Sequence, residues 1–360
     1  MRLLKLLLIL LAIGIVSCKK KDSKDIKVTT TPHHKKVIGF HPYQNEGLHQ
    51  RYDYDQLSAL AYTSVALDPA SGELLALNNW EKTTTIDSML SKGGKVYITI
   101  QLRHLSEAKE SLSPSALLKN KTIMTKSITN IQYLLDLRKA DGVVFDLDNL
   151  DTNDSAGFTK YMISLACQLK PDQELLIILP AVQPNYLDIY SLNQYVDSFI
   201  LSEKGYWDTE NNTVGPVAPI RSKKNSIRSS VKNYLALGVP KEKLILSVPY
   251  YGSLWKITQK TDSTQAATFL KYLTYKNIKN AYPQKVKYDS LAKSAYIEMV
   301  VDGSQLQLWF DNPQTLAAKY DFVNQNDLGG VALSYLGHDD GYAELWNLLD
   351  EKFNQQTASK

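Results

Sequence analysis

Short apolar segments alternate with amphipathic ones along most of the chain. Eight apolar segments have the length expected of strands, and several are near-continuous apolar runs, as is typical of parallel strands buried on both faces. The segments between them mostly carry hydrophobic residues at helical spacing. The predicted strands are residues 37–41, 58–67, 95–100, 142–147, 174–180, 196–202, 243–249 and 329–335. The predicted helices include residues 81–92, 113–138, 155–170, 225–238, 313–326 and 342–354.

Strands that alternate with helices predict an α/β fold with a parallel sheet. Eight such units fit a closed (β/α)8 barrel, the TIM barrel, better than an open sheet. An open doubly wound sheet is the alternative that the pattern alone leaves open. The first predicted strand ends in Gly39-Phe40-His41-Pro42, which is not the glycine-rich loop of dinucleotide-binding proteins.

Residues 255–308 form an unusually long connection between the seventh and eighth predicted strands. Residues 295–300 and 305–310 alternate apolar and polar positions around Asp302-Gly303. An Asp-Gly pair between two such segments is a good signal for a β-hairpin. We therefore expect a small α+β insertion on the rim of a barrel that spans residues 37–354, followed by a C-terminal tail at residues 355–360.

The first seventeen residues have the pattern of a secretion signal. Residues 1–5 are basic, and residues 6–16 form an apolar run that is too short to span a bilayer as a stable helix. Residues 15–18, ending in Cys18, resemble the cleavage box of a bacterial lipoprotein, with Cys18 as the lipidated first residue of the mature chain. An ordinary signal peptide with an incidental cysteine is the alternative. Residues 18–36 then form a basic tether that is too polar to fold.

Lipidation of Cys18 predicts a protein anchored in the bacterial cell envelope, in the outer membrane or at the cell surface. It also leaves Cys167 as the only other cysteine, without a partner for a disulfide. Cys167 lies in an apolar helical pattern, so we expect it to be a buried structural thiol.

The positive charge of the chain belongs to its ends. The whole chain has a formal charge of +4, yet residues 37–360 carry 32 Lys and Arg against 35 Asp and Glu, a charge of −3. A mildly acidic folded region argues against a nucleic-acid partner. The lysines of the tether are instead expected near anionic lipid headgroups. The six histidines show no spacing typical of metal ligands, so we expect neither a metal site nor a cofactor.

The stretch from Asp141 to Asp148 carries the most informative chemistry. It is an apolar run that ends in alternating carboxylates, Asp146 and Asp148. Side chains two residues apart on a strand point to the same face, so both carboxylates would face one site. Acids at the carboxyl end of a barrel strand are typical of catalytic residues. The alternative is a buried strand followed by an Asp-rich turn or helix cap.

The same stretch resembles the D-G-x-D-x-D-x-E signature of glycoside hydrolase family 18, the family of chitinases and endo-β-N-acetylglucosaminidases. Asp141, Gly142 and Asp146 match this signature. Val144 stands where the pattern usually has Asp, and Asp148 stands where it has the catalytic Glu. Other stretches that resemble the family in the same order are residues 37–43, 215–219, 237–252, 287–296, 310–313 and 328–341.

The resemblance implies substrate-assisted hydrolysis, an exception to the usual scheme with two carboxylates. A protonated Glu donates to the glycosidic oxygen, the N-acetyl oxygen of the sugar attacks C1, and an Asp two residues earlier holds the amide. A Tyr from the sixth strand and a Trp from the eighth complete the subsite. The resemblance thus makes Asp148, Asp146 and Asp141 the candidate catalytic residues.

Three positions of that subsite depart from the family pattern. Asp148 is one methylene shorter than Glu, and a misplacement of about 1 Å can cost about a hundredfold in rate. The family's Tyr falls at Glu203 or Lys204, with Tyr206 as the nearest tyrosine, and its Trp falls at Ser334. Together these departures predict that hydrolysis is weak, altered or absent.

Aromatic residues at the predicted carboxyl ends of strands, or in the loops after them, are candidate platforms for sugar rings. Each of them has packing in the core as its alternative. With Glu203, which stands in for the family's Tyr, the candidate substrate-binding residues are Tyr43, Glu203, Tyr206, Trp207, Tyr250, Trp255 and Tyr335.

Three functions remain open from the sequence. The first is a monomeric, lipid-anchored protein that binds glycans containing N-acetylglucosamine, such as chitin, peptidoglycan or N-glycan, without efficient cleavage. The second is an active chitinase or endo-β-N-acetylglucosaminidase that uses Asp148 as its acid. The third is a scaffold that has lost sugar binding. The altered subsite favours the first.

Overall fold

We describe the chain from a computed structural model. The described residues are 35–102, 114–146, 152–182, 187–206, 214–260, 265–282 and 285–354. The predicted signal sequence and almost all of the tether, with Cys18, lie outside these residues, as does the C-terminal tail. None of the helices in the described ranges is both long and apolar enough to cross a membrane.

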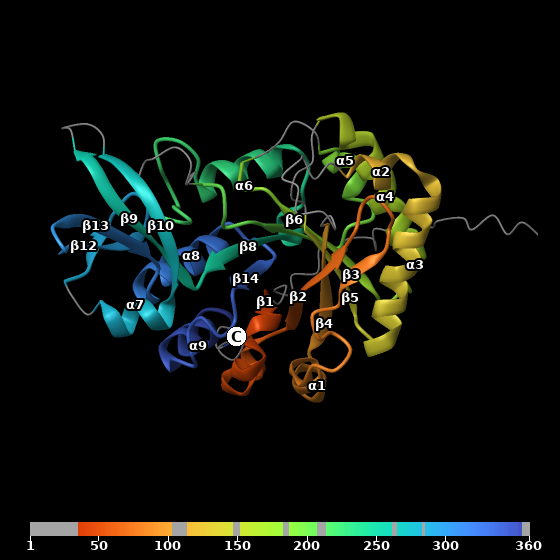
Figure 1. The fold of residues 1–360 in the computed structure, drawn as a ribbon, viewed down its shortest axis with the longest axis horizontal. Coiled ribbons are helices and arrows are strands. Elements are labelled where there is room, and N and C mark those ends of the chain that lie inside the picture. Colours follow the sequence, from red (N-terminus) through yellow and green to blue (C-terminus); the bar gives the residue numbers. More distant parts are fainter. Residues whose placement is uncertain are drawn as a thin grey trace, which may run out of the picture.

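The described part of the chain contains a closed barrel, as predicted (Figure 1). Its eight parallel strands follow the order β1-β14-β8-β7-β6-β5-β4-β2, and pairing of β1 with β2 closes the ring. All eight predicted strands are confirmed. They are β1 (Lys36–Pro42), β2 (Ala59–Leu67), β4 (Lys95–Leu102), β5 (Gly142–Asp146), β6 (Glu174–Leu179), β7 (Ser198–Leu201), β8 (Leu244–Pro249) and β14 (Gly330–Ser334). The short β3 (Leu74–Ala76) pairs with β2 in antiparallel orientation.

Helices connect most of the strands. The predicted helix 113–138 is divided into two, because Asn120 accepts hydrogen bonds from the backbone N–H groups of Thr122 and Ile123 and caps a new helix. The α-helices of the barrel are α1 (Thr84–Ser91), α2 (Ser115–Lys119), α3 (Lys121–Arg138), α4 (Ser155–Gln168), α5 (Ile189–Leu192), α6 (Ile227–Ala236), α8 (Pro313–Gln325) and α9 (Ala343–Leu349). Short 3-10 helices lie at Tyr43–Arg51 (η1), Tyr54–Gln56 (η2), Thr152–Asp154 (η3) and Lys241–Lys243 (η5), and a π-helical turn lies at Asp350–Asn354 (η6).

The prediction that Cys167 is a buried structural thiol is wrong. Cys167, near the end of α4, is half-buried and disulfide-bonded.

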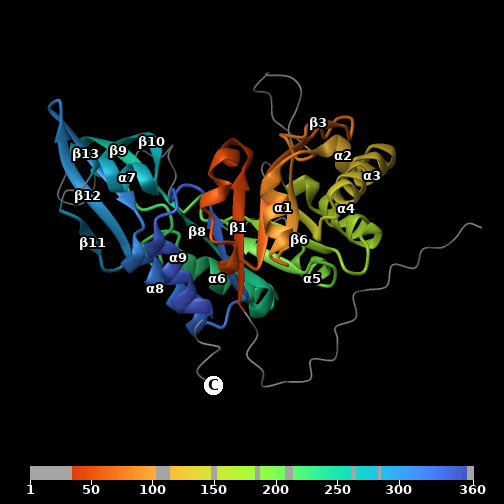
Figure 2. The same ribbon diagram turned by 90° about the horizontal axis from the view of Figure 1, so that it is seen from below.

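The insertion between β8 and β14 is a separate antiparallel sheet beside the barrel, on the side away from α3 (Figures 1 and 2). Its strand order is β10-β9-β13-β12-β11, and it extends beyond the predicted 255–308 at both ends. The predicted hairpin is present, with Val301 paired to Ser304 across Asp302-Gly303. The elements of the insertion are β9 (Tyr251–Lys260), β10 (Gln265–Thr274), α7 (Tyr275–Ala281), β11 (Lys287–Asp289), β12 (Ser294–Val301) and β13 (Ser304–Phe310).

The core has two layers because strand residues alternate between the two faces of the barrel wall. Ile38 and Phe40 of β1 point into the barrel, whereas Val37 packs outward against the helices. Small and large side chains fill the interior together, as in other small barrels. The interior cluster consists of Ile38, Phe40, Ala59, Ala61, Tyr97, Val144, Leu176, Ile200, Ile245 and Ala332.

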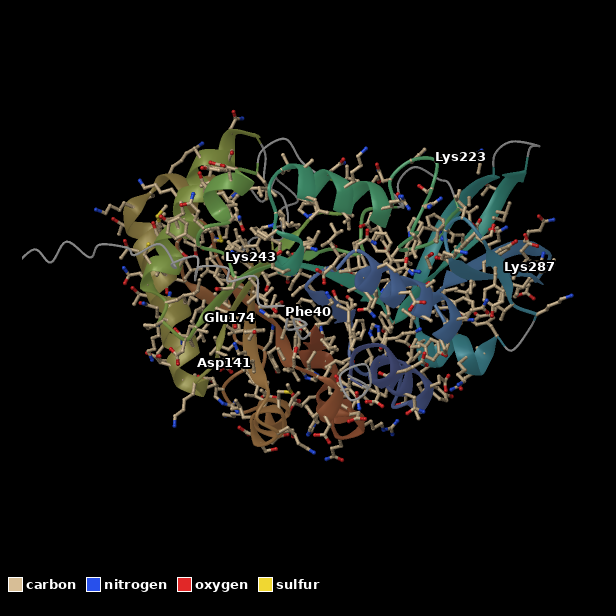
Figure 3. The ribbon with its side chains drawn as sticks, turned by 180° about the vertical axis from the view of Figure 1, so that it is seen from behind. Phe40, Asp141, Glu174, Lys223, Lys243 and Lys287 are labelled. Atoms are coloured by element: carbon tan, nitrogen blue, oxygen red, sulfur yellow. The ribbon has the colours of Figure 1, made fainter. Side chains whose placement is uncertain are left out.

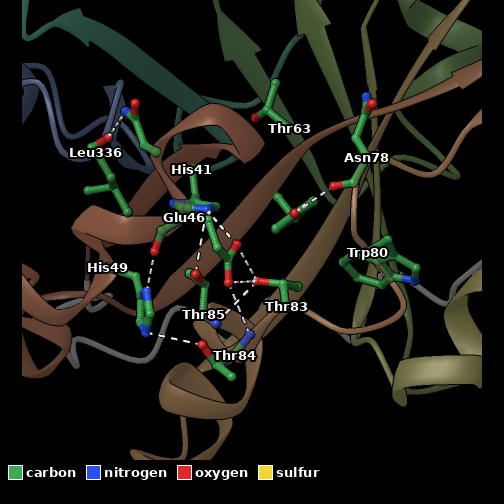
Figure 4. A network of polar contacts seen from close by, with 12 residues as sticks. His41, Glu46, His49, Thr63, Asn78, Trp80, Thr83, Thr84, Thr85 and Leu336 are labelled. Atoms are coloured by element: carbon green, nitrogen blue, oxygen red, sulfur yellow. Dashed lines mark hydrogen bonds and ion pairs between the residues drawn. The ribbon is translucent and has the colours of Figure 1, made fainter.

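Where β1 leaves the barrel, a polar network joins it to η1 and α1 (Figure 4). The buried His41 accepts from or donates to the Tyr52 hydroxyl at 2.9 Å, and its other ring nitrogen lies 3.6 Å from the Glu46 carboxylate. Glu46 in turn accepts hydrogen bonds from Thr83 and from the backbone N–H of Thr84, at the first turn of α1. Burial lowers the pKa of His41 to about 4, against the opposing effect of Glu46. This network fixes the loop that follows the first strand.

At the amino-terminal ends of the strands, Glu174 closes the bottom of the barrel. Its carboxylate pairs with Lys36 at 3.1 Å and with Lys95, and it accepts a hydrogen bond from the Tyr97 hydroxyl at 2.9 Å. Figure 3 shows Glu174 beside Asp141, the residue before β5. Burial alone would raise the pKa of Glu174, but Lys36, Lys95 and Tyr97 outweigh it and lower the pKa to about 2.

Replacing Glu174 by Gln is therefore expected to destabilise the fold in a pH-dependent way. A carboxyl whose pKa falls on folding stabilises the native state above its unfolded pKa, by about 3 kcal/mol for a shift of this size. That contribution is lost as the pH falls from about 4.5 towards 2. Urea unfolding should show a large deficit for Glu174→Gln at pH 7 and a smaller one at about pH 3.

Asp136→Asn is the matched control, because the Asp136–Lys170 pair is more than half exposed on both sides. Exposed pairs contribute about 0–1 kcal/mol. A deficit for Glu174→Gln that is equal at both pH values would contradict the prediction.

Candidate active site

A cavity of about 350 Å³ opens at the carboxyl ends of the barrel strands. This is the end at which barrels of this type bind their ligands. All eight parallel strands, or the residues directly after them, contribute to its wall. The residues that line it are Phe40, Thr63, Thr99, Gln101, Asp146, Ile178, Pro180, Ala181, Val182, Ile200, Ser202, Glu203, Lys204, Gly205, Ser247, Ser334 and Tyr335.

Asp146, the last residue of β5, presents its carboxylate to this cavity. The side-chain amide of Gln101, its register partner on β4, donates a hydrogen bond to it at 3.0 Å. Gln101 in turn accepts a hydrogen bond from the Ser64 hydroxyl at 2.9 Å, which fixes the orientation of the amide. The carboxylate of Asp146 is therefore held in a defined position at the wall of the cavity.

Glu203, just after β7, is a buried carboxylate in the lining of the cavity. Its side chain is only 4% exposed, and its carboxylate accepts hydrogen bonds from three hydroxyl groups on three other strands. The donors are Ser247 of β8 at 2.6 Å, Ser334 of β14 at 2.8 Å and Tyr251 of β9 at 3.0 Å. A buried carboxylate needs hydrogen-bond donors to offset its loss of hydration, and these three hydroxyl groups supply them.

Lys204, the exposed neighbour of the buried Glu203, adds a positive charge to the lining of the cavity. Its ammonium donates to the Tyr335 hydroxyl at 2.9 Å and lies 5.3 Å from the centre of the Tyr335 ring. Burial would lower the pKa of Lys204, but Tyr335, Glu203 and Asp146 outweigh it and raise the pKa above its usual value. Lys204 is therefore a cation at neutral pH.

Thr99 adds a hydroxyl group that needs a partner. The residue is 1% exposed and lines the cavity from β4, and its Oγ1 has no hydrogen-bond partner within the described residues. A buried hydroxyl without a partner is costly. This hydroxyl is therefore well placed to bond a polar group of a ligand.

The structure brings together three of the candidate residues from the sequence: Asp146, Glu203 and Tyr335 all line the cavity. Asp148 and Trp207 lie outside the described residues. The prediction that Asp141 is a catalytic residue is wrong, because Asp141 precedes β5 and lies at the end of that strand away from the cavity. Its carboxylate accepts a hydrogen bond from the backbone N–H of Val96 and secures the bottom of the barrel.

Three aromatic candidates, Tyr206, Tyr250 and Trp255, are also corrected, because their side chains are buried and do not line the cavity. Tyr206 and Tyr250 are buried in the layer between barrel and helices, and the Tyr250 hydroxyl lies 3.3 Å from that of Tyr320. Trp255 packs inside the insertion against Phe269. Tyr43 begins η1 and packs against the outer core.

The sequence interpretation missed Gln101, Thr99, Ser247 and Tyr251, which orient or surround the carboxylates. These residues could have been found from their positions, because they lie near the ends of apolar strands. A polar residue is unexpected there unless it contributes to a functional site. In the described ranges, no group of three or more His, Cys, Asp or Glu side chains is arranged to hold a metal ion.

Comparisons with known proteins agree with this geometry. The sequence model named "Glycosyl hydrolases family 18" matches residues 36–339. The cortical fragment-lytic enzyme of Bacillus anthracis is 20% identical over 250 residues, which cover 66% of this chain and 56% of that protein. The chain thus spans about half the length of the curated relatives that it matches.

Solved structures share the fold. The family 18 chitinase from Cycas revoluta, solved in complex with (GlcNAc)3, superposes with a TM-score of 0.76 at 18% identity, covering 89% of this chain and 100% of the chitinase. The chitinase-like agglutinin from Robinia pseudoacacia superposes with a TM-score of 0.75 at 17% identity, covering 88% of this chain and 99% of the agglutinin.

Proposed function

The chain belongs to glycosyl hydrolase family 18, and from that premise we propose that it binds glycans containing N-acetylglucosamine in the barrel cavity, with hydrolysis weakened or lost. The observation that carries the proposal is Asp146, the acid to which the resemblance assigns the acetamido group, held by Gln101 at the cavity wall. The Cycas chitinase of the same fold is titled as a complex with N-acetylglucosamine units. The size of the cavity, about 350 Å³, falls in the range of small-ligand sites.

The polar floor of the cavity supports weakened hydrolysis. Where the family pattern has Trp, Ser334 bonds to Glu203 instead of offering a ring. Where it has Tyr, the chain has Glu203 or Lys204, and its catalytic Glu is replaced by Asp148.

An active hydrolase that uses Asp148 is the second candidate. The name of the Bacillus anthracis relative, a fragment-lytic enzyme, favours it. The two candidates differ in product formation alone, since both need the cavity to bind the glycan.

Calorimetric titration of the full chain with chito-oligosaccharides, with chromatography of the same samples, separates these functions. We expect saturable binding with little or no shorter product. Rapid accumulation of products that Asp148→Asn abolishes would favour the hydrolase. Absence of both binding and products, with peptidoglycan and N-glycan fragments tested as well, would favour the scaffold function.

We also propose that the protein is a monomer held in the cell envelope by a lipid on Cys18, and that the lipidated form lacks the disulfide of Cys167. The basic tether of residues 19–36 supports this, since its lysines suit an anionic membrane surface. A thioether to lipid and a disulfide cannot share one sulfur, and Cys18 is the only cysteine besides the disulfide-bonded Cys167. Mass spectrometry of the amino-terminal peptide from membranes, with and without reductant, decides between the two fates of Cys18.

A further inference from the structure

We propose that the outer face of α6, with the loop before it, is a docking surface for an anionic lipid bilayer. The first observation is a concentration of positive charge on a folded region that is otherwise acidic. Residues 214–240 contain five basic residues and no Asp or Glu, whereas residues 37–360 carry a net charge of −3. The basic residues are Arg221, Lys223 and Lys224 in the loop and Arg228 and Lys232 on α6.

These five cations are free to bind a partner. All five side chains are exposed, and none of them forms an ion pair with another described residue. Figure 3 shows Lys223 on the outside of the molecule, before α6. Arg228 and Lys232 stand four residues apart on the helix, a spacing at which like charges destabilise it. An anionic partner would offset this repulsion.

The same helix face also carries exposed apolar side chains. Leu235 continues the stripe of Arg228 and Lys232, since positions i, i+4 and i+7 share one face of a helix. Leu235 and Leu237 are each 36% exposed. Cations beside exposed leucines are typical of helices that lie in the interface of a bilayer, where the charges meet the headgroups and the leucines reach the acyl chains. A soluble polyanion would have no use for the leucines.

The loop that carries the first three cations is held in place. The backbone N–H of Ile220 donates to the carbonyl oxygen of Ala292 in the insertion at 2.8 Å. The hydroxyl of Ser222 donates to the carbonyl oxygen of Asn225 at 2.6 Å, and Ser226 then caps α6. Because the surface is formed before it meets a partner, little conformational entropy is lost on docking.

The leucine end of this surface lies on the side of the barrel where the tether begins. Lys35, the first described residue, pairs with Asp327 at 2.8 Å. Lys241, four residues after Leu237, pairs with the other oxygen of the same carboxylate at 2.8 Å. This step rests on the proposed anchor at Cys18, which brings the tether to the membrane. None of the docking residues lines the cavity, so a glycan can still enter while α6 rests on lipid.

Sedimentation with phosphatidylcholine vesicles, with and without phosphatidylglycerol, tests the inference. It uses the mature chain of residues 18–360 with Cys18→Ser, so that neither a lipid nor a disulfide contributes and the tether is the same in every variant. Arg228→Gln with Lys232→Gln should weaken binding to the anionic vesicles about tenfold or more. Leu235→Ser with Leu237→Ser should weaken it severalfold, because the apolar contacts are lost.

Lys82→Gln with Lys121→Gln is the matched control, because it removes the same charge from exposed positions. Lys82 precedes α1 and Lys121 begins α3, and these two helices flank β4, which lies opposite β8 in the ring (Figure 1). Binding of this control should stay close to that of the parent chain. Since all the replaced side chains are exposed, the unfolding midpoints should also agree.

Three outcomes would overturn the inference. Equal losses in the α6 pair and the control pair would show that net charge alone drives binding. A loss in the cationic pair without one in the leucine pair would assign the surface to a soluble polyanion. Equal binding to neutral and anionic vesicles would remove the charge argument. The anchor and the glycan site are tested separately, by mass spectrometry of Cys18 and by calorimetry, so their failure is distinguishable from failure of the docking surface.

Discussion

Replacing Asp146 by asparagine is expected to weaken the binding of an N-acetylglucosamine oligosaccharide about tenfold to a hundredfold, the range for a lost hydrogen bond to a charged group. Gln101 explains why the change is not conservative. Its side-chain N–H group points at the acid, so the new amide side chain must turn its oxygen towards Gln101. The NH2 group of the new amide then faces the ligand's own N–H, donor against donor. Calorimetric titration of the full chain measures the loss.

Asp141→Asn is the matched control for this prediction. It changes the other matching acid of the signature, but Asp141 lies at the far end of β5 and accepts from the backbone N–H of Val96. Its replacement should lower the unfolding midpoint and leave the affinity of the folded protein unchanged. If Asp146→Asn binds as tightly as the wild type, the amide of the ligand does not contact Asp146 and the proposed placement of the sugar is wrong.

The departures from the family pattern are coupled in the structure. Glu203 and Ser334 stand on different strands, yet the hydroxyl of Ser334 donates directly to the carboxylate of Glu203, as does that of Ser247. Restoring the family's Trp at position 334 alone would remove one donor from a buried carboxylate and crowd the ring against it. A buried carboxylate that loses a partner costs stability. Glu203, Ser334 and Ser247 therefore have to be replaced together if the family pattern is to be restored. Inspection of single positions in the sequence does not reveal this dependence.

The barrel was predictable because hydrophobic burial sets the periodicity of every strand, and all eight strands were found from it. Which face an aromatic residue takes at the end of a strand was not predictable. A shift of one residue reverses the direction of a side chain, so Tyr250 packs against Tyr320 in the outer layer while its neighbour Tyr251 turns towards Glu203. Asp146 does face the cavity, because the strand before it is unbroken and fixes the direction of its side chain.

The partners of the site were harder to predict for a different reason. Gln101 and Ser247 acquire their roles only when strands distant in sequence lie side by side, as β4 does with β5 and β8 with β7. Asp141 was misassigned because a motif match carries no information on which end of a strand a residue occupies. The signature fixes a family, whereas the geometry separates its structural acid from the acid at the cavity.

Replacing Asp148 by glutamate is expected to raise the rate of chito-oligosaccharide hydrolysis about a hundredfold, the effect of correcting a misplacement of about 1 Å. Asp148 lies outside the described residues, so the prediction rests on the sequence, where the family pattern has the longer acid two residues after Asp146. The added methylene restores the reach that a general acid needs towards the glycosidic oxygen, within about 2.6–3.2 Å. Product chromatography under saturating substrate measures the rate.

Asp148→Gln is the control of equal length, since it has the reach of glutamate without the proton. It should stay at or below the rate of the wild type. A rate for Asp148→Glu that remains at the wild-type level would show that the length of the acid is not limiting. The obstacle would then lie in the lining of the cavity, where the ammonium of Lys204 disfavours the positive charge that develops on the acetamido group as its oxygen attacks C1. Asp148→Glu combined with Lys204→Tyr should then hydrolyse the glycan faster than either single variant, because the acid and a neutral donor are restored together.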